Sequence, residues 1–361
     1  MAQAATPRSQ PVTRTRFETQ ASKRRQEIMA GMAFISPAFI ILFVFLIVPM
    51  IAALYFSLTN WNGVTPLTRS DAYEFVGLEN YQRILLQSGT RQEAFFTSLK
   101  NTVYFVLGVV PVQTLLAMSL AVLVNQRWLK GKGFFRTTFY FPSISSSVVI
   151  SLIFMWMFNS DGIVNQGIRS IFPAYQSVTW LSDSNGILHN LLGLFGVTRD
   201  TLGEFGRTEI ASISIWDWLS GPSVTMLTIM ILNTWTTIGT LMVVFLAALQ
   251  NIPAQVYEAA YVDGATTMQI FRKITVPLLR PTTFFVVTLG LIGTFQVFDQ
   301  IYVISSGGPA DTTLTIAYLV YRSGFKDQRM GIAAATAIVL FLIIFVFTLI
   351  QRRITGGDRA A

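Results

Sequence analysis

Six runs of apolar residues, each long enough to cross a lipid bilayer as a helix, constrain this chain more than any other feature of its sequence. A hydrocarbon core about 30 Å thick requires about 20 helical residues. Helices are expected rather than barrel strands, because the alternating apolar pattern of barrel strands is absent. The runs are Met32–Leu58, Thr102–Val124, Thr138–Phe158, Val224–Leu249, Thr282–Ile304 and Gly331–Ile350. The sequence therefore predicts an all-α integral membrane protein with six transmembrane helices.

The composition of the chain excludes several other classes of protein. Hydrophobic residues make up 52% and charged residues 12%, whereas about a quarter of the residues in a soluble domain are charged. The chain has no cysteine and one histidine, His189, which lies far from any cluster of candidate ligands. We therefore expect no disulfide and no metal site.

The distribution of lysine and arginine predicts the orientation in the membrane. Of the 26 such residues, 16 lie in the N-terminal tail, in the loops after the second and fourth runs, and in the C-terminal tail, whereas nine lie in the other three loops. Positive loops stay in the cytoplasm during insertion. Both termini are therefore predicted to be cytoplasmic. The basic isoelectric point near 9.8 follows from this topology, so no nucleic-acid partner is expected.

The predicted domain organisation follows from these runs. Residues 1–29 are expected to form a disordered basic tail, residues 30–351 a six-helix membrane domain, and residues 352–361 a second cytoplasmic tail. The outer loop 159–221 is long, and its stretch Ile187–Val197 is expected to form a short interfacial helix. A second interfacial segment is expected at Leu314–Phe325.

The cytoplasmic loop 251–281 is more specific in sequence than a simple connection requires. Pro253 suits the first turn of a helix, which Gly264 then ends. Thr266 or Thr267 can cap a second helix, and Pro277 is expected to terminate it. The loop is therefore predicted to form a short helix-turn-helix.

Glu258, Ala259 and Ala260 are followed after three residues by Gly264, after nine more by Ile274, and after one more by Val276 and Pro277. This spacing resembles the EAA loop of binding-protein-dependent ABC importers. Val276 stands where that family usually has leucine, and this difference preserves an apolar side chain. The flanking residues Tyr257 and Phe271 resemble those of the carbohydrate branch of this importer family, which contains maltose-type and glycerol-phosphate-type permeases. The residues expected to couple to an ATPase are Glu258, Ala259, Ala260, Asp263, Gly264, Ala265, Ile274 and Pro277.

This resemblance implies a type I ABC importer permease, a multi-pass protein of the bacterial plasma membrane that is not itself an enzyme. The sequence contains no phosphate-binding loop of the Gly-x-x-x-x-Gly-Lys-Ser/Thr type. The resemblance implies two partner ATPase subunits, which would bind ATP and magnesium, so no cofactor is expected in this chain. It further implies a homologous permease in a heterodimer, an extracytoplasmic solute-binding protein, and a sugar substrate of one to several units.

Polar residues within the apolar runs indicate where a substrate would pass. A sugar needs hydrogen-bonding groups for its hydroxyls and an aromatic face for its C–H side, and the corresponding stretches form the substrate pocket in maltose-type relatives. Each Ser or Thr could instead bond within the helices, and Asp299 could instead anchor a helix end. The residues expected to line the path are Ser147, Asn233, Trp235, Thr237, Thr240, Phe295, Gln296 and Asp299.

Several alternatives remain open from the sequence. An importer of glycerol phosphate or another small solute would favour a cationic pocket, yet Lys100, at a helix end, is the only basic residue near the interior of the runs. A secondary transporter or channel would commonly show internal repeats, discontinuous helices or buried charge pairs, and none is predicted. The identities of the sugar and of the partner permease, and the role of loop 159–221, are not determined.

Overall fold

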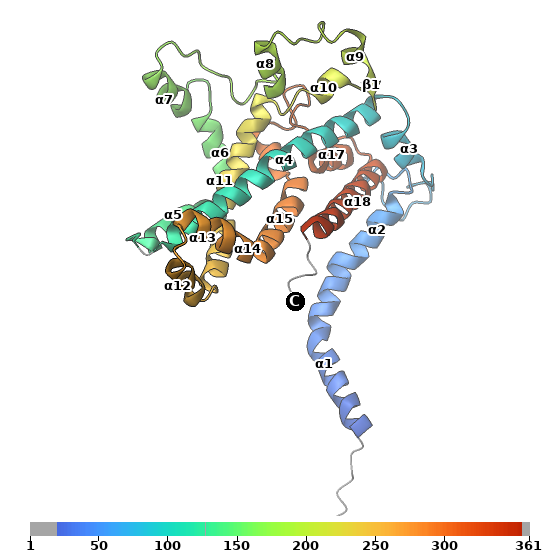
Figure 1. Cartoon of the computed structure of the whole chain (residues 1–361). Helices are drawn as coiled ribbons and strands as arrows, with labels where there is room; N and C mark the ends of the chain where they lie inside the picture. Colours follow the sequence, from blue (N-terminus) through green and yellow to red (C-terminus); the bar gives the residue numbers. More distant parts are fainter. Residues whose placement is uncertain (1–19, 127, 356–361) are drawn as a thin grey trace, which may run out of the picture. The chain divides into compact units, whose positions relative to one another are not determined.

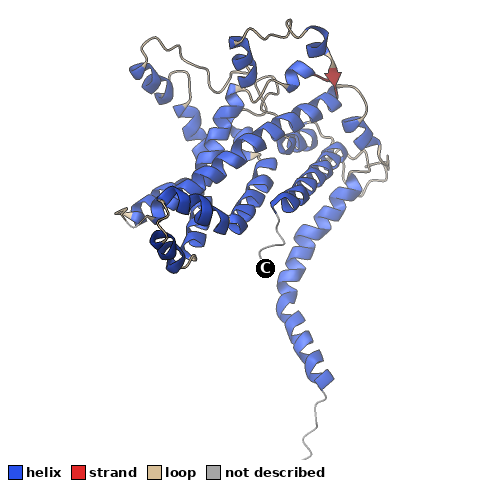
Figure 2. Cartoon of the chain, viewed as in Figure 1, coloured by secondary structure: helices blue, strands red, loops and turns tan. Residues whose placement is uncertain are grey.

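The computed structural model describes residues 20–126 and 128–355, and nearly all of its regular structure is helical (Figures 1 and 2). The chain divides into two compact units, Met1–Ala53 and Leu54–Ala361. In the first unit, α1 (Gln20–Leu42) continues through a π-helical turn (Phe43–Ile47) into α2 (Val48–Phe56).

The π-helical turn directly precedes Pro49, whose ring would clash with a carbonyl in a regular helix, and the wider turn relieves that clash. The described side chains of residues 23–51 are all exposed, as expected for a helix that faces lipid. Residues 20–29 were expected to be disordered, but α1 begins at Gln20. Their Gln, Ala, Lys, Arg and Glu side chains favour helix, so the helix extends beyond the apolar run. The rest of the predicted tail, residues 1–19, lies outside the described residues.

The long apolar helices correspond to the predicted runs, with one correction. Among the described residues, five helices are long and apolar enough to cross a membrane: Lys23–Phe56, Thr90–Asn125, Val224–Gln250, Arg280–Ile304 and Met330–Ile354. The third predicted run is not one continuous helix, because α5 (Lys132–Ile144) and α6 (Ser147–Met157) meet at an angle of 100°. Pro142 removes a backbone donor just before the break. The expectation that the chain has no discontinuous helix was therefore wrong.

The centre of the second unit is the pair α4 (Thr90–Asn125) and α11 (Val224–Gln250), with α5 packed on α11 and α15 (Arg280–Phe295) packed on α4. Ala117 and Ala121 of α4 are fully buried against Met242 and Phe245 of α11. Such small residues let two helix backbones approach closely.

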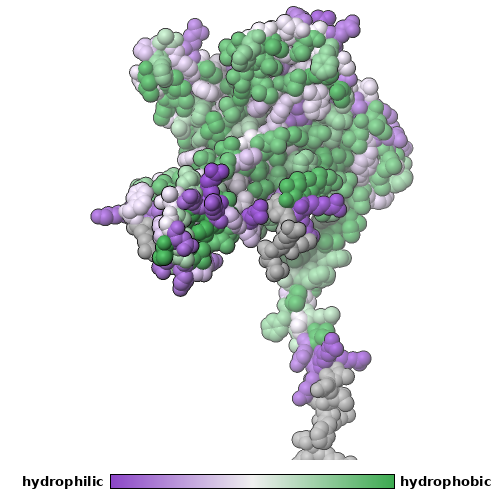
Figure 3. Space-filling model, in the orientation of Figure 1, coloured by the Kyte–Doolittle hydropathy of each residue, from purple (hydrophilic) through white to green (hydrophobic). Residues whose placement is uncertain are grey.

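At the other flank, α18 (Met330–Thr355) packs on α15, on α17 (Ile316–Tyr321) and on α3 (Glu79–Leu85). Because α18 continues to Thr355, residues 352–355 of the predicted C-terminal tail are helical, and residues 356–361 lie outside the described range. Much of the visible surface of this unit is hydrophobic (Figure 3), and Phe341, Leu342 and Phe345 of α18 are exposed, as in a bundle that faces lipid.

The long loop is folded rather than extended. Its helix α8 (Ile187–Leu194) confirms the short helix predicted at Ile187–Val197. The antiparallel pair β1–β2 was not predicted. Ser212 bonds to Gln92 of α4, with Oγ and Oε1 2.7 Å apart, so the loop is fastened to the bundle. The other elements of the loop are α7 (Ile163–Ile171), α9 (Gly203–Arg207), β1 (Glu209–Ile210), β2 (Ile213–Ser214) and α10 (Ile215–Trp218).

Loops 159–221 and 251–281 lie at opposite ends of the second unit (Figure 1), as alternating membrane crossings require. The second expected interfacial segment, Leu314–Phe325, contains α17 and most of a π-helical turn, Arg322–Lys326. α17 packs on α4 and α18, and its Ile316, Tyr318 and Leu319 are buried, so this helix belongs to the core of the bundle rather than lying on its surface.

Candidate transport cavity and coupling surface

A cavity of about 400 Å³ lies where α4, α11 and α15 meet the break between α5 and α6. Its walls are mostly small or polar side chains, and among the described residues that line it none is charged or aromatic. The lining residues are Gln113, Pro142, Ser143, Ser145, Ser147, Ile150, Asn233, Thr236, Thr237, Thr240, Leu241, Leu289, Gly290, Gly293, Thr294 and Gln300.

The break between α5 and α6 is built from serines. Ser145 and Ser146 have extended rather than helical dihedral angles. The hydroxyl of Ser145 donates to the carbonyl of Phe141 at 3.1 Å, and Ser143 donates to Tyr140 at 2.7 Å. Irregular backbone is tolerated at membrane depth where it lines a cavity, because polar groups there can meet water or substrate. The break therefore places backbone polar groups at the cavity wall.

Gln113 of α4 is a cavity residue that the sequence analysis missed. Its side chain is only 1% exposed, and its Oε1 accepts a hydrogen bond from Thr237 Oγ1 at 2.7 Å. Gly290 of α15 lies against the Gln113 amide and leaves no room for a side chain there. A glutamine in the middle of the apolar run 102–124 was the signal that could have identified this position.

Asn233 and Gln300 form a second polar bridge across the cavity wall. Asn233 Nδ2 donates to Gln300 Oε1 at 3.0 Å, joining α11 to the short helix α16 (Asp299–Ile304). Within the described part of the chain, the buried Asn233 Oδ1 accepts no hydrogen bond. An unpaired buried carbonyl is costly, so this atom is available to a hydroxyl group in the cavity.

The predicted path residues are divided between two adjoining hollows. Ser147, Asn233, Thr237 and Thr240 line the cavity of about 400 Å³. Ser147 and Asn233 also line a smaller hollow of about 200 Å³. Positions 233, 237 and 240 share one face of α11, because helical residues four and seven apart lie one above another.

Gln296 and Asp299 line the smaller hollow only. They flank the break between α15 and α16, and Asp299 is also the first residue of α16. The two expectations for Asp299, path lining and helix end, therefore describe the same position.

The two predicted aromatic residues lie outside both hollows. Trp235 points to another side of α11 and packs on Phe154, with ring centroids 5.5 Å apart. Phe295 is fully buried and packs on Phe347 at 5.2 Å. Trp235 lies two residues from Asn233, which turns it away from the face that Asn233 shares with Thr237. The polarity of these stretches was visible in the sequence, but the direction of each ring was not.

The loop 251–281 forms the predicted helix-turn-helix, in which α12 (Ala254–Val262) is followed by α13 (Thr267–Ile270). Gly264 has φ +75°, in the left-handed region that favours glycine. Thr266 caps α13, and Gln269 completes the capping box. The capping threonine is therefore the first of the two candidates.

Two prolines of this loop lie in positions that differ from the prediction. Pro253 is the N-cap of α12 rather than part of its first turn. Pro277 lies within α14 (Val276–Leu278), which follows a π-helical turn at Phe271–Thr275, instead of ending the helix. Proline is tolerated in a first turn, where its missing N–H would be unpaired in any case.

The surface of α12 and the following turn presents both polar and apolar side chains. Glu258, Ala259, Asp263, Gly264 and Pro277 are exposed, Ala265 and Ile274 are half-buried, and Ala260 is buried.

The sequence analysis missed the apolar part of this surface. Val262 is 88% exposed, and Tyr261 and Met268 beside it are also exposed. We call Glu258, Ala259, Tyr261, Val262 and Met268 the coupling surface. Apolar side chains gathered at a loop end indicate contact with another protein.

Comparison with known proteins gives consistent matches. Residues 88–356 match the family model described as binding-protein-dependent transport system inner membrane component. A probable ABC transporter permease protein, YesP, of Bacillus subtilis (strain 168) is 33% identical over 90% of each chain. The arabinooligosaccharides transport system permease protein AraP of Halalkalibacterium halodurans is 34% identical, with 78% of this chain and 76% of the relative covered.

A third relative, the lactose transport system permease protein LacF of Rhizobium radiobacter, is 30% identical over 92% of this chain and 96% of its own length. Among solved structures, a chain of a bacterial ABC transporter involved in the import of the acidic polysaccharide alginate matches with a TM-score of 0.70 and 21% identity, covering 94% of this chain and all of that one. The structural match shows that the fold is shared.

Proposed function

This chain belongs to the family of binding-protein-dependent transport system inner membrane components, and from that premise we propose that it is a permease subunit of an ATP-driven importer of neutral sugars. The relatives described above include permeases named for arabinooligosaccharides and for lactose. A substrate of one to several sugar units is consistent with a cavity of about 400 Å³ and an adjoining hollow of about 200 Å³.

The observation that carries the proposal is the chemistry of the cavity lining. Hydroxyl and amide groups of Ser, Thr, Asn and Gln can donate to and accept from sugar hydroxyls. An anionic solute such as glycerol phosphate would require a cation to offset its desolvation, and the described lining residues supply none. The lining therefore favours a neutral polyol over a phosphorylated one.

We further propose that two separate ATPase subunits, which bind ATP and magnesium, dock on the coupling surface. Glu258 supplies a charge at this surface, and the exposed Val262 supplies apolar area. An ATPase can drive transport only by binding one permease conformation more tightly than the other. The left-handed turn at Gly264 fixes the direction of the segment after α12, so movement of the segment can be passed to the long helices.

The remaining partners follow from the family. A solute-binding protein belongs to such a transport system by the description of the family itself. A homologous permease would complete the translocation path. We propose that the two permeases form a heterodimer.

Transport by the assembled complex tests this function. The complex of both permeases and the ATPases is reconstituted in proteoliposomes with its binding protein, and uptake of labelled arabinose oligomers, lactose, maltose and glycerol 3-phosphate is compared. We expect ATP-dependent uptake of at least one neutral sugar. Uptake that continues without ATP would instead identify a secondary transporter or channel, and ATP-dependent uptake of glycerol phosphate alone would contradict the sugar assignment.

A further inference from the structure

A second hollow, of about 380 Å³, lies at the other flank of the same unit and shares no residue with the transport cavity. It is formed by α3, the start of α4, the turn Arg322–Lys326 and the start of α18. Its lining residues are Ile84, Thr90, Arg91, Ala94, Leu319, Arg322, Ser323, Asp327, Arg329, Ile332 and Thr336. We call it the arginine pocket.

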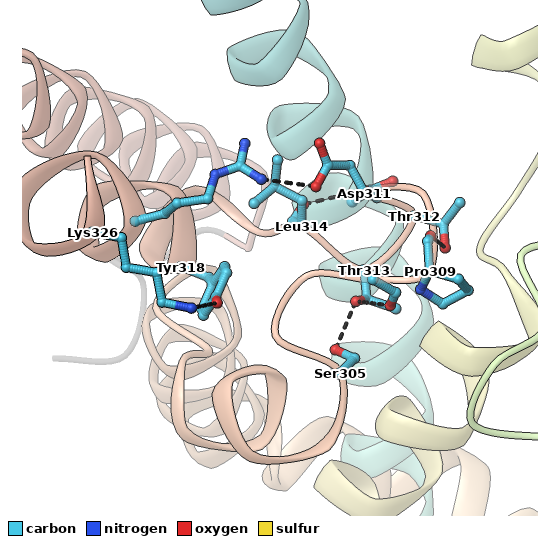
Figure 4. Close-up of polar contacts among 11 residues, drawn as sticks. Ser305, Pro309, Asp311, Thr312, Thr313, Leu314, Tyr318 and Lys326 are labelled. Carbon is cyan, nitrogen blue, oxygen red and sulfur yellow. Dashed lines mark hydrogen bonds and ion pairs between the residues drawn. The ribbon is translucent and has the colours of Figure 1, made fainter.

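Three arginines and one aspartate line this pocket, so its lining carries an excess of positive charge. Arg322 is held in place by Asp311, with Nη1 and Oδ1 2.8 Å apart (Figure 4). Within the described part of the chain, the guanidinium groups of Arg91 and Arg329 form no hydrogen bond or ion pair. Arg91 and Arg329 therefore line one pocket together with Arg322, and Asp327 is the single acid among the lining residues.

Nearby on α3, the guanidinium of Arg83 is paired with Glu79, so this pair adds no net charge beside the pocket. Asp327 lines the pocket but is exposed and pairs with none of the arginines among the described residues. Like charges gathered in a partly buried pocket repel one another, and an anion bound between them would remove that repulsion.

The floor of the pocket differs from its rim. Ile84 and Leu319 are buried there, and Thr336, also buried, donates its hydroxyl to its own helix. The pocket thus joins a cationic rim to an apolar floor at the ends of the long helices, where lipid headgroups lie. This combination suits a group that is anionic at one end and apolar at the other.

A neighbouring cation is fixed as well. Lys326 Nζ donates to the Tyr318 hydroxyl at 3.0 Å (Figure 4). This hydrogen bond holds the pKa of Lys326 above its ordinary value. Lysine is charged at neutral pH, so Lys326 adds a second cation to the turn that carries Arg322.

We propose that the arginine pocket binds a phosphate group through Arg91 and Arg329, with Arg322 held beside them by Asp311. Guanidinium groups match phosphate oxygens in paired hydrogen bonds, which makes arginine the residue best suited to this role. The phosphate could belong to an anionic phospholipid headgroup or to free phosphate, and both offer the same chemistry to the rim.

The test uses the assembled transporter, purified in detergent and stripped of lipid. Its thermal midpoint is measured at constant ionic strength with phosphatidylglycerol, with phosphatidylcholine, or with inorganic phosphate. The double variant Arg91→Gln/Arg329→Gln is compared with the wild type. Arg207→Gln is the matched control, because Arg207 is an exposed arginine of the long loop whose ion pair with Asp200 is 3.4 Å long and solvent-exposed.

We expect phosphatidylglycerol or phosphate to raise the thermal midpoint of the wild type and of Arg207→Gln. In the double variant, the apparent affinity for the same ligand should fall about tenfold or more, which corresponds to a loss of about 1.4 kcal/mol of binding free energy. A response to phosphate would identify a soluble ligand, and a response to phosphatidylglycerol alone a lipid. An equal response to phosphatidylcholine, no response to any of the three, or a double variant that responds like the wild type would overturn the proposal. If the double variant does not assemble, Arg329→Gln alone serves, because Arg329 lies at the exposed rim.

Discussion

Thr237 of α11 donates a hydrogen bond to Gln113 of α4, with 2.7 Å between Oγ1 and Oε1, and both residues line the transport cavity. The same hydroxyl also lies 2.8 Å from the carbonyl of Asn233 in its own helix. One threonine thus joins the two central helices at the wall of the cavity.

The first prediction concerns this pair. Thr237→Val keeps the volume of the side chain but removes the donor, leaving Gln113 to reorient into the cavity. We expect a loss of stability of about 0.6 to 1.5 kcal/mol and a several-fold rise in the sugar concentration needed for half-maximal uptake. Thr348→Val is the control, because the Thr348 hydroxyl bonds only within α18. Wild-type uptake in Thr237→Val would assign the residue to packing alone.

A second prediction addresses the contact of α11 with α5. A methyl group at Gly239 would overlap the backbone carbonyl of Phe139, and backbone cannot move aside as a flexible side chain can. Gly239→Ala is therefore expected to destabilise the protein by about 1–3 kcal/mol, the usual range for overpacking. This loss would be measured as a lower thermal midpoint of the purified complex. Gly133→Ala in α5 meets no atom within 4 Å and should leave the midpoint unchanged or raise it. Equal midpoints for the two variants would show that α5 and α11 are not packed this closely.

The third prediction concerns coupling. Gly264→Val places a branched side chain at φ +75°, which costs about 1–2 kcal/mol for a non-glycine residue and changes the direction of the chain after α12. Glu258→Ala removes an exposed charge and should leave the fold intact.

Both variants should lose the stimulation of ATP hydrolysis by loaded binding protein in proteoliposomes. The control Gln255→Ala, also exposed on α12, should retain it. Normal stimulation in both Glu258→Ala and Gly264→Val would contradict the assignment of the coupling surface.

A fourth prediction concerns the folded outer loop. Replacing residues 184–214 with a short Gly/Ser linker removes α8, α9 and the β1–β2 pair, together with the bond from Ser212 to Gln92. If the loop docks the binding protein, the affinity for that protein should fall while both permeases still assemble with the ATPases. Unchanged affinity and uptake would make the loop a tolerated insertion, since long surface loops cost little closure entropy.

Hydropathy identified the five long apolar helices of the described residues, because the thickness of a bilayer imposes a length that can be read directly from the apolar runs. The residues around Glu258 and Gly264 likewise predicted α12 and the turn that follows it, and they narrowed the cap of α13 to Thr266 or Thr267. These features depend on neighbouring residues only, so the order of amino acids determines them.

The cavity required the tertiary structure, since its walls come from segments that are distant in the sequence. Gln113 lies 124 positions from Thr237, and neither residue alone indicates that the two meet. The sequence could not show that the run 138–158 bends by 100° at its serines, nor that Trp235 and Phe295 lie outside the two hollows. The direction in which a side chain points depends on how the whole helix is rotated about its own axis. Only packing against neighbouring helices sets that rotation.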